Sequence, residues 1–116
     1  MKPAAMMQEN NLRSRDVKKE GYLLKKSKIL GQWRNRWMVL TSNYLFAYEE
    51  QNCKGPHTEK LLLRNIDQVV EGAHEQGYYI FNIKTKDGKG LYLKSQQREE
   101  VLSWIQELRK WKDKGQ

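Results

Sequence analysis

Cysteine, proline and long apolar runs are all scarce in this sequence of 116 residues. The only cysteine, Cys53, has no second cysteine with which to form an internal disulfide, as is typical of proteins in a reducing compartment. The apolar runs are a few residues long, whereas a membrane-spanning helix needs about 20 residues. The N-terminus also lacks the pattern of a signal peptide. We therefore expect a cytoplasmic protein whose contact with membranes, if any, is peripheral and reversible.

The chain also lacks the residue sets of common catalytic sites. It contains no recognisable Ser/His/Asp or Cys/His arrangement and no glycine-rich phosphate loop. The two histidines, His57 and His74, together with Cys53 do not have the number or spacing of ligands that a metal site requires. The sequence thus predicts no enzyme, no catalytic residue, no metal and no cofactor.

Positive charge, in contrast, is abundant and concentrated. Residues 13–36 contain nine basic and two acidic side chains, which is +7 of the formal net charge of +8. The other 92 residues are nearly neutral, with 13 basic and 12 acidic side chains. Solvated lysines scattered over a surface would not gather in one segment, so we expect one pole of the molecule to bind anions. The nine basic residues are Arg13, Arg15, Lys18, Lys19, Lys25, Lys26, Lys28, Arg34 and Arg36.

The length fits one domain with its own core. Residues 1–16 show no usable periodicity and are predicted to be a flexible leader, followed by a domain at 17–113 and a tail at 114–116. Alternation of apolar and polar residues, interrupted by turn signals, predicts seven strands. They are expected at residues 20–26, 32–41, 44–49, 60–63, 68–74, 78–85 and 91–94.

The period then changes to that of an amphipathic helix, which would begin at Ser95 as N-cap and end near residue 112. Its apolar positions are Val101, Leu102, Trp104, Ile105 and Leu108. Such a helix needs an open sheet surface to cover. The predicted fold is therefore mainly β with one α-helix: a strongly bent seven-stranded antiparallel sheet or barrel, capped by the C-terminal helix.

Three sequence features resemble the pleckstrin homology (PH) family. They are the stretch GYLLK at 21–25, the stretch WRNRWMVL at 33–40, and Trp104 within the final helix. The resemblance covers about residues 18–112 and implies the PH-like fold. It also implies binding of phosphoinositides through a spaced basic motif, which Lys25, Arg34 and Arg36 match.

The residues themselves support such a site. Side chains two positions apart on a strand share a face, so Arg34 and Arg36 can direct forked donors at one phosphate. Lys25 would approach from the neighbouring strand. The predicted phosphate-binding residues are Lys25, Lys28, Arg34 and Arg36, and the auxiliary basic residues are Lys18 and Lys26.

Two positions depart from the family pattern. Gly31 lies where members selective for 3-phosphoinositides often have lysine, and Ala47 lies where many have a tyrosine that touches a phosphate. Both departures leave the pocket with fewer phosphate donors, which favours a shallow site for a phosphomonoester. The candidates are a monophosphorylated phosphoinositide and phosphatidic acid. The latter is used by a group of apicomplexan acylated PH-domain proteins, to which the chain has a narrower resemblance.

Two apolar residues, Ile29 and Leu30, interrupt the basic loop between the first two strands. They either fold back onto the protein or insert among lipid acyl chains. The tryptophans Trp33, Trp37 and Trp104 are expected to pack within the fold rather than to bind a ligand.

The function predicted from these features is a monomeric, peripheral membrane-targeting module for acidic phospholipid head groups. The main alternative is a protein–protein interaction adaptor with little specific lipid binding, which would use a strand edge or the C-terminal helix. Nucleic-acid binding is disfavoured despite the pI of about 9.6, because no RNA-binding aromatic motif is present.

Overall fold

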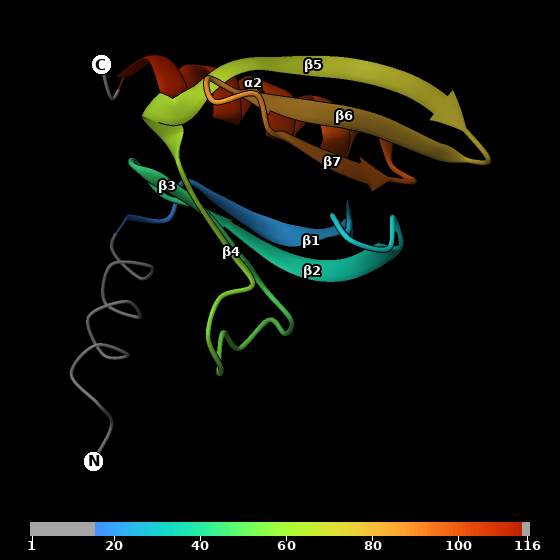
Figure 1. Ribbon diagram of the computed structural model, residues 1–116, viewed down its shortest axis with the longest axis horizontal. Coiled ribbons are helices and arrows are strands. Elements are labelled where there is room, and N and C mark those ends of the chain that lie inside the picture. The colour runs from blue at the N-terminus through green and yellow to red at the C-terminus, as the bar shows by residue number, and fades with distance from the viewer. Residues whose placement is uncertain (1–15, 115–116) are drawn as a thin grey trace.

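The computed structural model describes residues 16–114, so the predicted leader and tail lie outside it except for Asp16 and Lys114. Seven strands precede one long helix (Figure 1). None of the helical segments in the described residues combines the length and apolar character needed to cross a membrane. The elements are β1 (Lys19–Lys26), β2 (Trp33–Leu40), β3 (Tyr44–Tyr48), β4 (Glu59–Leu62), the 3-10 turn η1 (Leu63–Asn65), β5 (Ile66–Glu75), β6 (Tyr78–Thr85), β7 (Gly90–Ser95) and α2 (Arg98–Lys114).

The strands form one antiparallel sheet in the order β4-β3-β2-β1-β7-β6-β5. β1 pairs along its whole length with β2 but meets β7 only at Leu24 and Lys25. Because this junction is short, the sheet bends there into two layers, with β1–β4 in one and β5–β7 in the other (Figure 1). The predicted bent antiparallel sheet with a C-terminal helix is confirmed.

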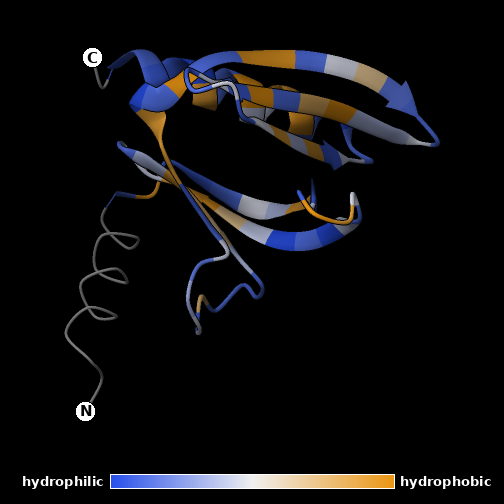
Figure 2. Ribbon diagram, viewed as in Figure 1, coloured by the Kyte–Doolittle hydropathy of each residue, from blue (hydrophilic) through white to orange (hydrophobic). Residues whose placement is uncertain are grey.

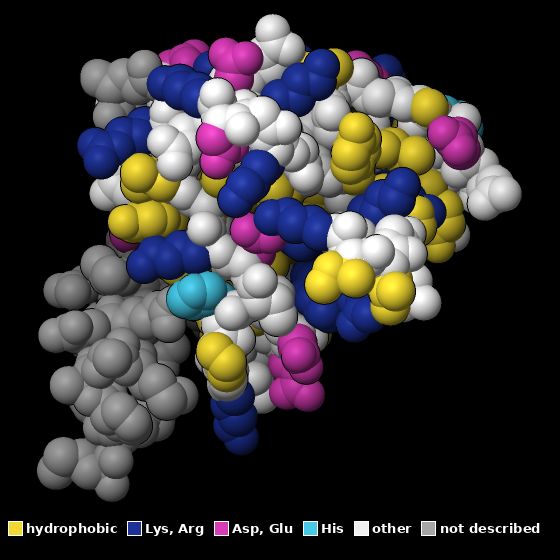
Figure 3. Space-filling view, in the orientation of Figure 1, with side chains coloured by type: hydrophobic (Ala, Val, Ile, Leu, Met, Phe, Trp, Pro, Cys, Tyr) yellow, Lys and Arg dark blue, Asp and Glu magenta, His cyan; other side chains and the backbone are white. Residues whose placement is uncertain are grey.

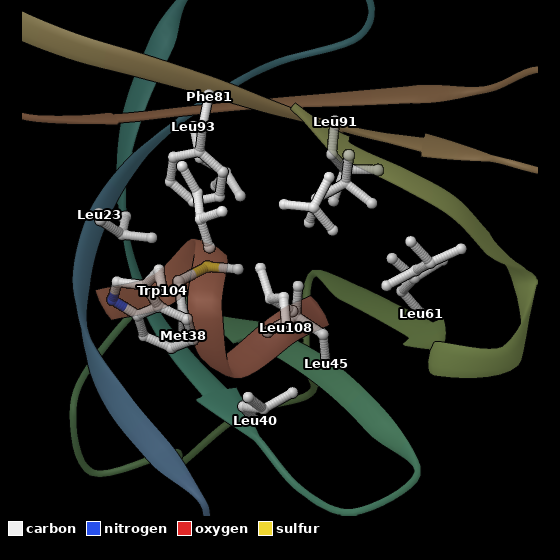
Figure 4. Close-up of a cluster of buried hydrophobic side chains, with 14 of the residues drawn as sticks. Leu23, Met38, Leu40, Leu45, Leu61, Phe81, Leu91, Leu93, Trp104 and Leu108 are labelled. Carbon is white, nitrogen blue, oxygen red and sulfur yellow. The ribbon is translucent and has the colours of Figure 1, made fainter. Parts of the chain in front are cut away.

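The core lies between the two layers and under α2, which packs against β5, β6, β7 and η1. Trp104 is fully buried, as predicted, and its ring lies near Met38 from the opposite layer (Figure 4). Burying apolar area is the main stabilising contribution to such a fold. Its largest fully buried side chains include Trp104, Phe81, Met38, Leu40, Leu45, Ile83, Leu93 and Leu108.

A second, smaller cluster covers the outer face of β2 and β3. Val39, Phe46 and Tyr48 form it together with Cys53 from the β3–β4 loop. Trp37 packs against this cluster, as expected of a sheet-packing residue, and its Nε1 donates a hydrogen bond to Glu20 at 3.2 Å. Both faces of β2 are therefore partly covered, which anchors the strand that carries the two predicted arginines.

The N-terminus of α2 differs from the prediction. The Val101 N–H donates to the carbonyl of Gln97 at 3.2 Å, so Gln97, and not Ser95, occupies the cap position. The Ser95 hydroxyl instead accepts a hydrogen bond from the Gln97 N–H at 3.1 Å, which orders the turn just before the helix. At its other end α2 continues to Lys114, two residues beyond the predicted end.

Asp16, predicted as the last residue of the leader, is bound to the β2–β3 turn. Its Oδ2 accepts hydrogen bonds from the Ser42 hydroxyl at 2.6 Å and the Ser42 N–H at 3.1 Å, and Lys18 lies 3.3 Å from Oδ1. Partial burial raises the pKa of this carboxyl, but the hydrogen bonds from Ser42 and the charge of Lys18 outweigh it and lower the pKa below its ordinary value. The charged Asp16 carboxylate thus holds the segment that leads into β1 against the β2–β3 turn.

The outer edge of β5 is closed at one point by the helix. Arg109 of α2 directs both Nε and Nη2 at the carbonyl oxygen of Val69, at 3.1 and 2.7 Å. Because β5 is the last strand in the sheet order, this carbonyl has no neighbouring strand to bind on that side. The helix therefore satisfies an edge acceptor of the sheet as well as covering the core.

Candidate anion-binding site

The β1–β2 hairpin brings the predicted basic residues together by its register. Lys25 lies opposite Arg34, and Leu23 lies opposite Arg36. The loop is held by two hydrogen bonds: the Ser27 N–H donates to the Gln32 carbonyl at 2.7 Å, and the Gln32 N–H donates to the Ser27 hydroxyl at 3.1 Å. These contacts order both ends of the loop, so the residues between them are presented in a defined place.

All four predicted phosphate-binding residues line one open depression of about 540 Å³. This basic pocket is within the usual size range of small-ligand sites. Arg34 and Arg36 reach it from β2, while Lys25 comes from β1 and Lys28 from the loop. Its remaining lining residues are Ser27, Ile29, Leu30, Thr58 and Glu59.

The structure gives a physical setting for the two departures from the family pattern. Gly31 has φ +66°, a backbone conformation that a side chain such as lysine would strain. Ala47 of β3 is fully buried. It is paired with Met38 of β2 on one side and with Glu59 of β4 on the other. The hairpin geometry thus favours glycine at one position, and a methyl group fills the other.

Glu59 is the residue that the sequence reasoning missed. It begins β4, and its Oε1 lies 3.3 Å from Nζ of Lys25 and 3.7 Å from Nζ of Lys28. The side chains of Lys25 and Glu59 are only 12% and 17% exposed. No local pattern predicts this contact, because Glu59 lies more than thirty positions from Lys25 in the sequence.

The two arginines have different surroundings. Nη2 of Arg34 contacts the Gln32 side-chain oxygen at 3.4 Å, and Nη1 of Arg36 donates to the Asn35 carbonyl at 2.9 Å. Among residues 16–114, neither guanidinium forms an ion pair with a carboxylate. The basic pocket therefore has a lysine half that holds a carboxylate and an arginine half whose charge is uncompensated.

Ile29 and Leu30 do not fold back onto the described part of the chain. Their exposed fractions are 93% and 65%, the largest among the exposed apolar residues of the structure. In Figure 2 the β1–β2 loop carries a hydrophobic stretch beside the hydrophilic first half of β2. Figure 3 shows hydrophobic side chains next to Lys and Arg side chains at this end of the molecule. Apolar and cationic groups thus share one exposed surface.

Lys26 lies on the other face of the hairpin from Lys25. Together with Lys94 of β7 it lines a separate groove of about 400 Å³, which we call the outer groove. Nζ of Lys94 lies 4.2 Å from the ring centre of Trp33 and 4.3 Å from that of Tyr78, and Nζ of Lys26 lies over Trp33 and Tyr92 at 5.9 and 5.7 Å. These lysines make cation–π contacts. The structure does not bring Lys26 into the basic pocket.

Lys18 lies at the opposite end of β1. Besides its ion pair with Asp16, its Nζ lies 4.6 Å from the ring centre of Trp111 in α2. The seven residue steps from Lys18 to Lys25 correspond to about 23 Å of extended strand. Lys18 therefore stabilises the junction of β1 with the helix and does not line the basic pocket.

The two histidines make aromatic contacts. His57 packs against Phe46 with ring centres 5.7 Å apart, and His74 stacks on Tyr79 at 4.0 Å. In the part of the chain that the structure describes, no three His, Cys, Asp or Glu side chains are grouped so that they could hold a metal ion.

Comparison with known proteins places this geometry in context. The family model described as "PH domain" matches residues 17–112. Ras-specific guanine nucleotide-releasing factor 1 of Mus musculus is 25% identical over 105 residues, and pleckstrin-2 of Mus musculus is 27% identical over 95 residues. These matches cover 81% and 79% of this chain but only 8% and 27% of the two relatives. The matched segment thus makes up only a small part of these two relatives.

Solved structures share the fold. The crystal structure of the C-terminal PH domain of pleckstrin has a TM-score of 0.73 and 24% identity, over 84% of this chain and 99% of that one. The same domain in complex with D-myo-Ins(1,2,3,5,6)P5 has a TM-score of 0.71 and 22% identity, over 83% and 95%. The Slm1-PH domain in complex with inositol-4-phosphate has a TM-score of 0.64 and 22% identity, over 80% and 93%. None of these matches supports the narrower apicomplexan resemblance.

Proposed function

The chain belongs to the PH domain family, and from this premise we propose that it is a peripheral membrane-targeting module for acidic phospholipid head groups. One observation carries the proposal: four basic side chains converge on one pocket directly beside two exposed apolar side chains. Phosphate binding explains the cations, and insertion into the acyl region explains Ile29 and Leu30. A soluble phosphate ligand would leave the apolar tip without a role.

The chemistry of the basic pocket suits a phosphate group. Arg34 and Arg36 share one strand face and present forked donors, which bind phosphate oxygens through charge-assisted hydrogen bonds. Lys25 and Lys28 add ammonium groups from the other side. We assign head-group recognition to these four residues, and insertion to Ile29 and Leu30.

The energetics favour specific recognition over charge attraction alone. Inserting two apolar side chains contributes roughly 3–6 kcal/mol. Four cations and Glu59 leave three net charges, which add about 3 kcal/mol at an anionic surface. The gross gain of roughly 6–9 kcal/mol is offset largely by the loss of translational and rotational freedom. Stable attachment therefore depends on contacts with one particular head group.

Two head groups fit these requirements. A phosphoinositide is supported by the solved PH domains of pleckstrin and Slm1, which are known in complex with inositol phosphates. Phosphatidic acid also carries a phosphomonoester, and its small head group needs few contacts. We propose a phosphoinositide as the first candidate and phosphatidic acid as the second.

The test is co-sedimentation with phosphatidylcholine vesicles of fixed total negative charge. The added lipid is phosphatidylserine, phosphatidic acid, or a mono-, bis- or trisphosphorylated phosphoinositide. The wild type is expected to prefer one phosphomonoester. Arg36→Ala should weaken that binding at least about tenfold, because it removes a charged hydrogen bond.

Arg64→Ala is the matched control, because it removes the same charge from an exposed residue of η1 outside the basic pocket. It is expected to leave the preference unchanged. Equal binding of wild type and Arg36→Ala to the preferred vesicles would contradict the pocket assignment. Equal, weak binding of the wild type to every anionic lipid would favour the adaptor function instead.

A further inference from the structure

The ion pairs of Glu59 have a geometry that resembles ligand binding. Two ammonium groups, from Lys25 and Lys28, approach the same oxygen atom, Oε1 of Glu59. This is the arrangement in which two lysines would hold one phosphate oxygen. A carboxylate of the protein therefore occupies part of the basic pocket that an anionic ligand would use.

Several features hold the carboxylate in that position. Glu59 is the first residue of β4, and its backbone is paired opposite Ala47 of β3. Just before it, the Thr58 N–H donates to the Ala47 carbonyl at 2.7 Å, which fixes the entry of the strand. Ala47 carries only a methyl group, so it adds little bulk beside the Glu59 side chain. The placement of Glu59 is thus built into the β3–β4 pairing.

The two halves of the basic pocket consequently differ in what they can accept. The arginine half has no carboxylate partner among the described residues and can take one phosphate while the Lys–Glu pairs remain. A second phosphate would have to enter the lysine half, beside or in place of the Glu59 carboxylate. Like charges brought together in a partly buried site are strongly disfavoured, which is a common source of specificity.

We propose that Glu59 is a specificity-determining residue that restricts the basic pocket to head groups with a single phosphomonoester; this inference rests on the proposed function. It acts by repulsion, and this effect is independent of the absence of phosphate-binding side chains at Gly31 and Ala47. Removing its charge frees Lys25 and Lys28 for a second phosphate and opens the pocket to bisphosphorylated head groups.

The experiment compares wild type with Glu59→Gln on vesicles that contain a mono- or a bisphosphorylated phosphoinositide at equal total charge. The variant is expected to bind the bisphosphorylated lipid about tenfold more tightly and the monophosphorylated lipid less than about threefold more tightly. Glu50→Gln is the matched control, since it removes the same charge from an exposed residue outside the basic pocket. It should leave the ratio of the two affinities unchanged.

Two additions keep the result unambiguous. Glu59→Asp retains the charge but withdraws it by one methylene, and it should give a smaller change of ratio in the same direction, even if Glu59→Gln fails to fold. Calorimetry with soluble inositol mono- and bisphosphates should show the same change of ratio without a membrane. A change seen only on vesicles would indicate surface charge and would overturn the assignment.

The outcomes separate this inference from the function on which it rests. If Arg36→Ala loses binding while Glu59→Gln leaves the ratio as in wild type, or matches Glu50→Gln, then Glu59 does not set specificity and the pocket assignment stands. If Arg36→Ala binds like wild type, the pocket assignment is wrong and the role of Glu59 falls with it.

Discussion

The two faces of the β1–β2 hairpin treat neighbouring lysines in opposite ways. Lys25 points into the basic pocket and meets a carboxylate, whereas Lys26 points into the outer groove and lies over aromatic rings. On the pocket face, two arginines add donors with fixed, forked geometry. On the groove face, Lys94 shares the rings of Trp33 and Tyr78. Lys25 and Lys26 are adjacent in the sequence, but their positive charges therefore lie in two different sites.

The difference indicates a division of labour within the proposed function. On the pocket face, the forked arginine donors attract a phosphate and the Glu59 carboxylate repels one. The strength of each interaction depends on where the phosphate lies, so this face can discriminate between head groups. Lysines over aromatic rings attract anions but impose little geometry on them. We expect the pocket face to select the lipid and the groove face to attract any anionic membrane.

The loop tip common to both faces gives the largest expected effect. Replacing Ile29 and Leu30 together with serine removes the proposed insertion and should weaken binding to the preferred vesicles on the order of 100-fold. Affinity for the soluble head group, measured by calorimetry, should remain as in wild type because all four basic side chains of the pocket are retained. Loss of both affinities, or of neither, would contradict separate roles for tip and pocket.

A smaller effect distinguishes the two faces directly. Lys26→Ala should weaken binding to every anionic vesicle by about 1 kcal/mol, or about fivefold, and the loss should disappear at high salt. Lys25→Ala removes the same charge from the adjacent residue and leaves Glu59 without its closest ammonium group. It should therefore change the ranking of the lipids. If both variants behave alike in the vesicle panel, the division between the faces is wrong.

The smallest expected effect on binding is that of replacing Asp16, near the far end of β1, because this residue affects stability and lies away from the basic pocket. Asp16 has a lowered pKa, so its stabilising contribution is present above the ordinary value of 3.8 and is lost as the pH falls through the lower folded-state value. Asp16→Asn should lower the free energy of unfolding by about 1 kcal/mol at neutral pH and by progressively less in acid. Denaturant unfolding at several pH values measures this difference. A change in lipid ranking in this variant would show that selectivity does not reside in the hairpin alone.

Most of the fold could be predicted from periodicity, and the errors have identifiable causes. Alternation located all seven strands, but β5 begins at Ile66, two residues before its predicted start, and ends at Glu75, one residue after its predicted end. Ser95 is a residue type that often caps helices, yet the helix begins later, after Gln97. Local chemistry thus identified the elements better than their boundaries.

The candidate site was predictable where it depends on one hairpin. Strand alternation placed Arg34 and Arg36 on one face, and the structure shows that they line one pocket with Lys25 and Lys28. The same alternation places Lys26 on the opposite face from Lys25. Because Lys26 is the last residue of β1, directly before the loop, its face was not predicted from the sequence. Glu59 could not be found in this way, because only the pairing of β3 with β4 brings it to the lysines.

The contact between Arg109 and the edge of β5 has a consequence for crowded membranes. Membrane binding concentrates a protein in two dimensions, and an open strand edge is a template on which further copies can pair. Here the Val69 carbonyl is already occupied by Arg109, and the exposed residues Glu71 and Glu75 on the same strand repel an identical edge. Under the proposed function, copies of the domain gathered at a lipid surface are therefore not expected to pair through the β5 edge.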